Sequence, residues 1–137
     1  MFAALPLMAL PILAYNLLVL VLGGVRRSDV AERLAARIAA IPMASRIDWP
    51  LSLGDLFVAG SLVVLFVELL KAASSRHAAV INHSLSMVLF IGCLVEFLLF
   101  PAFATSTFFL LTLMVLLDVL AGFIITLAAE RREIDVR

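Results

Sequence analysis

The chain has 137 residues, of which 65% are hydrophobic and only 15% are charged, and its formal net charge is zero. Soluble domains are usually about 45–50% apolar and about 25% charged, and a fold of this size has too little interior to bury so many apolar side chains. We therefore exclude an ordinary soluble domain and expect a lipid bilayer around the chain. The zero net charge gives no reason to expect nucleic acid as a partner, and a single cysteine excludes an intrachain disulfide or a multi-cysteine metal site.

The first apolar run, residues 2–24, carries no charge and is long enough to cross a hydrocarbon core of about 30 Å. It has no basic residue before it and no small-x-small cleavage site after it, so the pattern favours a retained helix over a cleaved signal peptide. Pro6 and Pro11 should bend or fray its first half. The alternative is a signal anchor or a half-inserted segment.

The most polar part of the chain follows, and its pattern predicts a short amphipathic helix over residues 29–41. Asp29 and Glu32 resemble a capping box, apolar residues then recur at helical spacing, and Pro42 ends the helix. A basic amphipathic helix often lies in the lipid interface, although a solvated connecting helix fits as well. Trp49 is expected to be an interfacial anchor at the mouth of the next span.

Three further apolar runs predict membrane-spanning helices over residues 54–73, 78–100 and 105–129, followed by a charged, mobile tail over residues 130–137. Ser52 with Asp55 predicts the cap of the first of these helices, and Thr105 or Ser106 that of the last. Short turns between them require antiparallel neighbours. The expected fold is therefore all-α: a single membrane domain of four transmembrane helices in an antiparallel bundle, with the interfacial helix added.

The orientation of this bundle is set by lysine and arginine, which favour cytoplasmic loops. The ten Lys and Arg residues are divided evenly between the two sides of the expected bundle. Arg26 and Arg27 favour a cytoplasmic location for the loop after the first span, but arginines of an interfacial helix can instead be engaged with headgroups. We expect both termini to be cytoplasmic.

Three carboxylates lie inside the expected spans: Glu68, Glu96 and Asp118. An aspartate at a helix centre costs about 2.5–3.5 kcal/mol, and the many apolar residues of the last span outweigh that cost. Such a carboxylate should face the bundle interior and not lipid. Each carboxylate shares a helix face with small or polar residues, and small residues let neighbouring helices approach closely. The helix-packing residues expected from this pattern are Gly92, Ala121 and Gly122.

Depth along the helices predicts a ladder of polar contacts. Glu68 should lie level with Asn82 and His83 across the turn, and Asp118 should lie near Ser86. Glu96 would form a separate rung near the opposite membrane face, with the rungs about 10 Å apart at 1.5 Å per residue. The candidate polar or ion-path residues are therefore Glu68, Asn82, His83, Ser86, Glu96 and Asp118.

Two interpretations of these residues stay open. In the first they are interhelical hydrogen-bond partners, with carboxylates that burial can keep protonated, and Glu68 pairs with Lys71 three residues later. In the second they mark a proton or cation path, which would need water between the rungs. The chain lacks the motifs of hydrolases, nucleotide-binding loops, haem sites and metal sites. We therefore predict no catalytic residue, no metal and no cofactor.

Three stretches carry a resemblance to known proteins: SLGDLFVAGSLVVLFVELLKA, INHSLSMVLFIGCLVEFLLFPAFATSTFFLLTLMVLLDVLAGF and AERRE. From Trp49 to its end the chain resembles a family of small proteobacterial four-helix inner-membrane proteins of unknown function. The resemblance implies a polytopic bacterial membrane protein. It implies no reaction, ligand or site residue.

The expected function is that of a non-enzymatic integral protein of the bacterial inner membrane. Its partners would be lipid and either further copies of itself or other membrane proteins, as an accessory subunit of a larger complex. The alternative is an oligomeric proton- or cation-coupled channel or small transporter that uses the intramembrane carboxylates, because four short helices alone enclose little space.

Overall fold

The protein is mostly helical with one small sheet, in a computed structural model that describes residues 5–74 and 76–136. The elements in chain order are α1 (Ala9–Val21), α2 (Val30–Ala35), β1 (Arg37–Pro42), β2 (Asp48–Ser52), α3 (Leu53–Ser74), α4 (Arg76–Leu99), the 3-10 helix η2 (Pro101–Phe103) and α5 (Ser106–Val136). The two strands form an antiparallel pair.

Three helices are long and apolar enough to cross a membrane: α3, residues Val80–Leu99 of α4, and α5. They agree with the three spans expected after residue 50. In the most apolar stretch of each helix, 22% of α3 and 17% of α4 are buried within the chain, against 39% of α5. The two outer helices therefore present most of their apolar surface outward.

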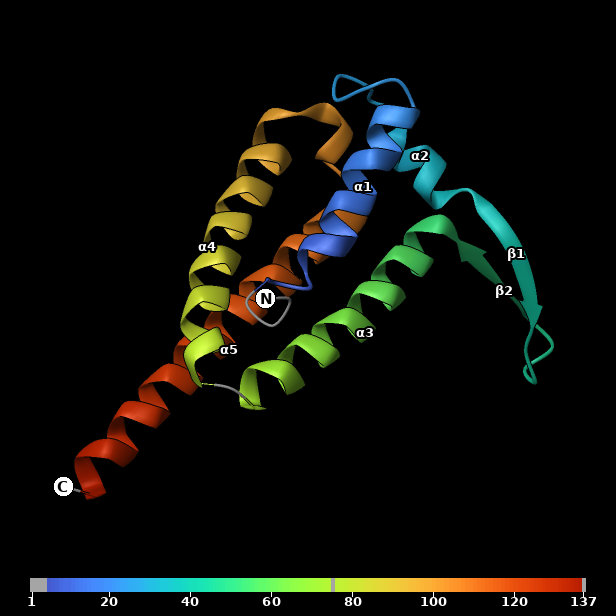
Figure 1. Cartoon of the computed structure of the whole chain (residues 1–137). Helices are drawn as coiled ribbons and strands as arrows, with labels where there is room; N and C mark the ends of the chain where they lie inside the picture. The colour runs from blue at the N-terminus through green and yellow to red at the C-terminus, as the bar shows by residue number, and fades with distance from the viewer. Residues whose placement is uncertain (1–4, 75, 137) are drawn as a thin grey trace.

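The helices pack around α5, which lies between α3 and α4 in Figure 1. α3 and α4 diverge from neighbouring ends, and α1 packs against both of them and against α5. The core holds an aromatic cluster, in which the ring centroids of Phe103 and Phe108 are 4.8 Å apart and Tyr15 lies 4.9 Å from Phe108. This cluster joins α1 to the segment between α4 and α5.

The first apolar run forms a shorter helix than the expected span over residues 2–24, of which residues 1–4 lie outside the described residues. α1 has 13 residues, or about 20 Å at 1.5 Å per residue, whereas about 20 residues are needed to span a bilayer. Pro11 lies in its first turn, where a missing N–H is tolerated. Gly23 and Gly24, with φ of 116° and 99°, end the helix in the left-handed conformations that glycine allows.

Residues 29–41 are not one amphipathic helix, so that prediction is wrong. α2 ends at Ala35, and residues 37–42 form β1 instead. No polar residue interrupts positions 38–43, so the sequence there does not distinguish the period of a helix from that of a strand. Pairing with β2, which supplies the backbone hydrogen-bond partners, makes this segment a strand. Pro50 is tolerated in β2 because both strands of a two-stranded sheet are edge strands.

The expected capping box at the start of this segment is also wrong. The Asp29 side chain makes no capping hydrogen bond to α2. It accepts hydrogen bonds from Arg27 Nε at 2.7 Å and from Arg33 Nε at 2.9 Å. The hydrogen bonds from Arg27 and then Arg33 hold the pKa of Asp29 well below its usual range. A pair of arginines therefore orders this loop in place of the cap.

The charged segment after residue 129 is helical, contrary to the expected mobile tail over residues 130–137, of which residue 137 lies outside the described residues. α5 continues to Val136 and extends beyond the ends of the other helices in Figure 1. After Gly122 the chain has no glycine or proline, and alanine, glutamate and arginine are good helix formers. Exposed charge alone therefore does not end this helix.

The two other expected caps are confirmed. The Asp55 carboxylate accepts hydrogen bonds from the Ser52 N–H at 2.9 Å and the Ser52 hydroxyl at 2.7 Å, and the Ser52 Oγ accepts one from the Asp55 N–H at 3.1 Å. These reciprocal bonds form a capping box at the start of α3. At the start of α5, the Thr105 Oγ1 accepts the Phe108 N–H at 3.1 Å, so Thr105 is the cap and Ser106 is not.

Candidate functional site

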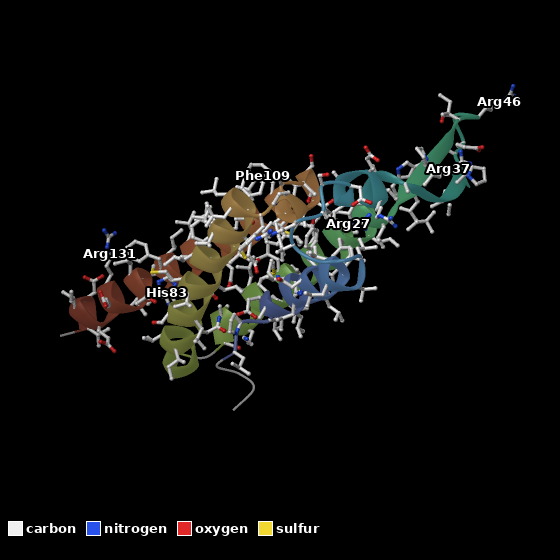
Figure 2. The ribbon with its side chains drawn as sticks, turned by 90° about the horizontal axis from the view of Figure 1, so that it is seen from above. Arg27, Arg37, Arg46, His83, Phe109 and Arg131 are labelled. Carbon is white, nitrogen blue, oxygen red and sulfur yellow. The ribbon has the colours of Figure 1, made fainter. Side chains whose placement is uncertain are left out.

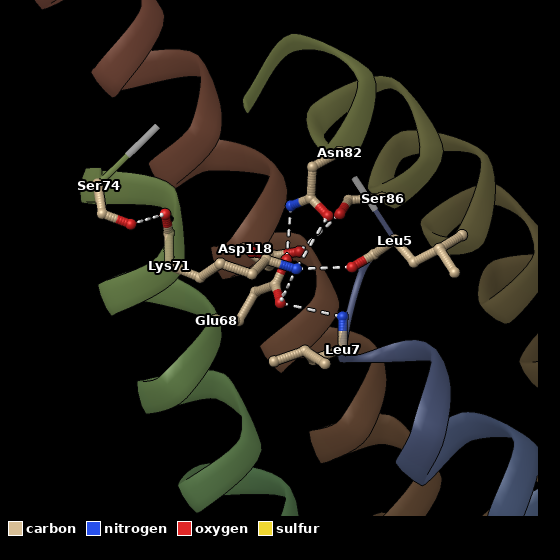
Figure 3. Close-up of polar contacts among 8 residues, drawn as sticks. All are labelled: Leu5, Leu7, Glu68, Lys71, Ser74, Asn82, Ser86 and Asp118. Carbon is tan, nitrogen blue, oxygen red and sulfur yellow. Dashed lines mark hydrogen bonds and ion pairs between the residues drawn. The ribbon is translucent and has the colours of Figure 1, made fainter. Parts of the chain in front are cut away.

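The candidate site is a polar cluster between the helices, formed by Glu68, Lys71, Asn82, Ser86 and Asp118 and shown in Figure 3. Glu68 on α3 is fully buried. Its Oε1 accepts a hydrogen bond from Asn82 Nδ2 on α4 at 2.5 Å, which confirms the expected level of these two residues. Its Oε2 forms an ion pair with Lys71 Nζ at 3.0 Å, as the three-residue spacing allows.

The same two side chains hold the segment that leads into α1. The Leu7 N–H donates to Glu68 Oε2 at 3.0 Å, and Lys71 Nζ donates to the Leu5 carbonyl at 2.6 Å. Backbone groups outside regular helix have no intrahelical partner and are costly to leave unpaired in an apolar medium. Glu68 and Lys71 therefore satisfy the backbone of the N-terminal segment and attach it to α3.

Asp118 faces the interior, as expected from the small residues on its side of α5. The carboxylate accepts a hydrogen bond from Ser86 Oγ at 2.7 Å, and the two side chains are 4% and 1% exposed. This confirms the expected contact between the last two spans. The bond joins α4 to α5 across their main packing interface.

The two inner rungs of the expected ladder form a single cluster. Asn82 and Ser86 occupy successive turns of α4, four residues or about 6 Å apart along the axis, which is closer than the expected spacing of about 10 Å. Glu68 and Asp118 therefore approach the same stretch of α4 from two sides (Figure 3).

His83 does not contact Glu68, although depth along the helices predicts that the two residues lie level. Its ring packs against α5, stacked on Phe123 with centroids 6.4 Å apart. A Cβ at Gly122 would lie 2.8 Å from His83 Nδ1, so the glycine is required for this close approach. The buried Nδ1 has no hydrogen-bond partner among the described residues. Figure 2 shows His83 on α4 next to the C-terminal half of α5.

Glu96 forms a separate contact with α1, as the expected ladder has it apart from the other acids. Asn16 Nδ2 donates to Glu96 Oε2 at 3.3 Å and to the Ile12 carbonyl at 3.1 Å. Glu96 is half-buried. This hydrogen bond fixes α1 against α4 near the end of the bundle that is distant from Lys71.

The expected packing residues divide into three cases. Gly122 packs against His83, and Ala121 is half-buried on α5. Gly92 is exposed, and a Cβ there would meet nothing within 4 Å, so it packs no helix within the described chain. Trp49 lies in β2 with 47% of its surface exposed, away from the polar cluster.

A second polar contact was missed by the sequence analysis. The Tyr15 hydroxyl donates to the Ala102 carbonyl at 3.1 Å and shares a 2.6 Å hydrogen bond with Thr105 Oγ1. Tyr15 is fully buried among the aromatic rings of the core. A lone tyrosine in an apolar helix indicates such a contact, because its buried hydroxyl needs a hydrogen-bond partner. The partners lie in the segment between α4 and α5, whose position cannot be predicted from helical periodicity.

The polar cluster contains carboxylate, ammonium, amide and hydroxyl groups. These groups can exchange protons and can form hydrogen bonds that hold neighbouring segments of the chain together. Within the described residues, His, Cys, Asp and Glu form no group of three that could hold a metal ion. Cys93 is a free thiol buried in α4 at 1% exposure.

No family model, curated protein or solved structure matches the chain.

Proposed function

We propose that the chain is a non-enzymatic, multi-pass protein of a bacterial inner membrane that works by association, as a subunit of an assembly of its own copies or of other membrane proteins. In this proposal α1 is a fourth, shorter membrane element that completes a four-helix bundle, and both termini are cytoplasmic. Lipid covers the remaining surface. The chain would belong with the small proteobacterial proteins that it resembles.

The observation that carries the proposal is that the buried carboxylates are engaged within the chain. Glu68 contacts the side chains of Lys71 and Asn82 and the Leu7 backbone, and Asp118 contacts Ser86. Polar contacts of this kind hold transmembrane helices together. Both carboxylate oxygens of Glu68 and one of Asp118 are engaged in this way, and an engaged oxygen is a poor ligand for an ion in transit.

The uncovered faces of α3 and α4 support association. Both helices bury less than a quarter of their most apolar stretch. Gly60 on α3 and Gly92 on α4 are exposed, and each has open space where a Cβ would lie. Small residues at a helix surface let a second helix approach closely, which is the main source of attraction between helices in lipid.

The test is the protein mass of particles extracted from native membranes in polymer-bounded lipid discs. The proposal expects particles that contain more protein than one chain of 14.9 kDa. Gly92→Leu should reduce that mass to one chain, because a large side chain blocks close approach at a site where it meets no atom of its own chain. Ile91→Leu, at an exposed neighbouring position, is the matched control and should leave the mass unchanged.

Discs that hold one chain and lipid only, for the wild-type protein, would contradict the association. An unchanged helical circular dichroism spectrum for Gly92→Leu would show that the fold survives the substitution. Loss of assembly would then reflect the blocked surface and not unfolding.

A proton- or cation-coupled oligomer is the second candidate, and two observations favour it. His83 Nδ1 is buried without a partner among the described residues. A cavity of about 430 Å³ opens between the C-terminal end of α3 and residues 125–132 of α5. Its lining includes Ala72, one turn after Glu68, and Ile125, two turns after Asp118. Water in this cavity would lead from one membrane surface toward the polar cluster.

Thiol labelling tests this second candidate. In a Cys93→Ser background, Ala129→Cys places a thiol in the cavity lining, and Leu127→Cys places one on the exposed apolar side of the same helix. An ion path requires that a water-soluble thiol reagent label position 129 faster than position 127. Equal, slow labelling at both positions would exclude a water-filled entrance.

A further inference from the structure

The β1–β2 hairpin carries most of its large apolar side chains on one face, which we call the apolar face. The register pairs Ile41 with Trp49 and Ala39 with Leu51 on one face, and Ala40 with Pro50 on the other. Met43 and Ile47 continue the first face, because their backbones are joined by a 3.2 Å hydrogen bond next to the turn. The apolar face therefore consists of Ala39, Ile41, Met43, Ile47, Trp49 and Leu51.

This apolar face is uncovered. Every residue from 41 to 50 is exposed, including Ile47 at 71% and Met43 at 49%. A two-stranded hairpin is at best marginally stable in water on its own, and it needs a further apolar layer to persist. Among the described residues no other element supplies that layer at the tip of the hairpin.

The attachment of the hairpin fixes its depth. β2 ends at Ser52 and α3 begins at Leu53, so the hairpin base is the end of a helix that is long enough to span a membrane. The capping box of Ser52 and Asp55 marks the polar end of that helix. Figure 1 shows that the hairpin projects sideways from this point and diverges from α3, and Figure 2 shows that its tip with Arg46 lies away from the helices.

Two arginines border the apolar face. Arg46 lies at the tip (Figure 2), where the Arg46 N–H donates to the Met43 carbonyl at 2.9 Å and the Arg46 φ is 64°. This left-handed position at the end of a three-residue hairpin loop is usually taken by glycine, and here it carries a cation instead. Arg37 lies at the start of β1, and Asp48 lies on the face opposite to Trp49.

We propose that the hairpin lies in the headgroup region of the bilayer, with its apolar face toward the acyl chains and Arg37 and Arg46 at lipid phosphates. A tryptophan, isoleucine and methionine face with cations at its border is the composition of elements that lie in a membrane interface. Lipid is the apolar layer that the hairpin lacks. The inference rests on the membrane location of α3 and is independent of the proposed association.

Trp49 provides the probe, because it is the one tryptophan of the chain. The full chain is reconstituted in phosphatidylcholine vesicles, with lipids brominated either near the headgroup end or near the chain end of the acyl groups. Interfacial elements lie roughly 5–10 Å into the headgroup boundary, so shallow bromines should quench Trp49 about twofold more than deep bromines. Aqueous acrylamide should quench it weakly.

Two neighbouring alanines of β1 provide a matched pair of variants. Ala39→Asp places a charge on the apolar face, and Ala40→Asp places the same charge on the opposite face. Ala39→Asp should shift Trp49 emission to longer wavelength and remove most of the bromine quenching. Ala40→Asp should leave both properties as in the wild-type chain.

Two results for the wild-type chain would overturn the proposal, and neither depends on a variant that must fold. Strong acrylamide quenching without bromine quenching would place the hairpin in water. Protection from both quenchers would place it against protein, either a second copy or a partner.

Discussion

Glu68→Leu is the substitution that most directly disturbs the attachment of the N-terminal segment. It removes the carboxylate that pairs with Lys71 and accepts hydrogen bonds from Asn82 and the Leu7 N–H. Breaking a buried ion pair by removing one partner costs about 3–5 kcal/mol. Lys71 is 21% exposed and can reach toward water, so the low end, about 3 kcal/mol, is expected for the pair. Each lost interhelical hydrogen bond adds about 0.6 kcal/mol.

The double variant Glu68→Leu/Lys71→Leu separates the two contributions. Replacing both members of a buried ion pair by apolar residues is often neutral, so the double variant should recover about 2 kcal/mol relative to Glu68→Leu. Stability is measured by unfolding the purified chain in mixed micelles of increasing dodecyl sulfate fraction. Amide exchange at Leu7 should rise in both variants, because both lose its hydrogen-bond acceptor.

The reasoning is refuted if Glu68→Leu unfolds at the wild-type dodecyl sulfate fraction and the Leu7 amide remains protected. A double variant less stable than Glu68→Leu would show instead that Lys71 contributes mainly through another contact.

Three further predictions concern other parts of the fold. Gly54→Ala should destabilise the chain by about 1–3 kcal/mol in the same unfolding assay, because its Cβ would lie 2.7 Å from Thr107 Oγ1; Gly60→Ala, with open space around it, should gain up to about 1 kcal/mol from helix propensity. Tyr15→Phe should cost about 1–3 kcal/mol, because the buried Ala102 carbonyl loses its donor and the Thr105 hydroxyl loses a hydrogen-bond partner. The lowered pKa of Asp29 implies that its contribution to loop order is complete above the unfolded pKa of about 4 and is lost only as pH falls through the lower folded pKa. The protection of the α2 amides, measured as exchange relative to an unfolded chain at the same pH, should therefore be unchanged between neutral pH and about pH 4 and should fall below it.

The parts of the fold that could be predicted are those in which one physical requirement dominates. Long apolar runs bounded by charge predict α3, α4 and α5, because only a continuous helix satisfies its backbone in lipid. The contact of Asp118 with Ser86 follows from the same geometry, since residue number determines both the depth and the face of a side chain on a helix. The capping box of Ser52 and Asp55 is local and needs no tertiary information.

The parts that could not be predicted depend on partners distant in sequence. The segment of β1 fits two periodicities, and its strand conformation is decided by pairing with β2. The contact of Lys71 with the Leu5 carbonyl depends on where α1 begins, and three apolar residues on each side of Pro6 leave that start undetermined. Depth along the helices predicts that His83 lies level with Glu68, but its ring packs into the space that the missing side chain of Gly122 leaves on α5.

The central claim is that the buried carboxylates join helices and do not conduct ions, and proton flux into vesicles that hold the purified chain tests it most directly. The account predicts that a pH gradient across these vesicles decays no faster than across protein-free vesicles, both for the wild-type chain and for Asp118→Asn. Wild-type flux that Asp118→Asn abolishes, with the helical circular dichroism spectrum unchanged, would contradict it.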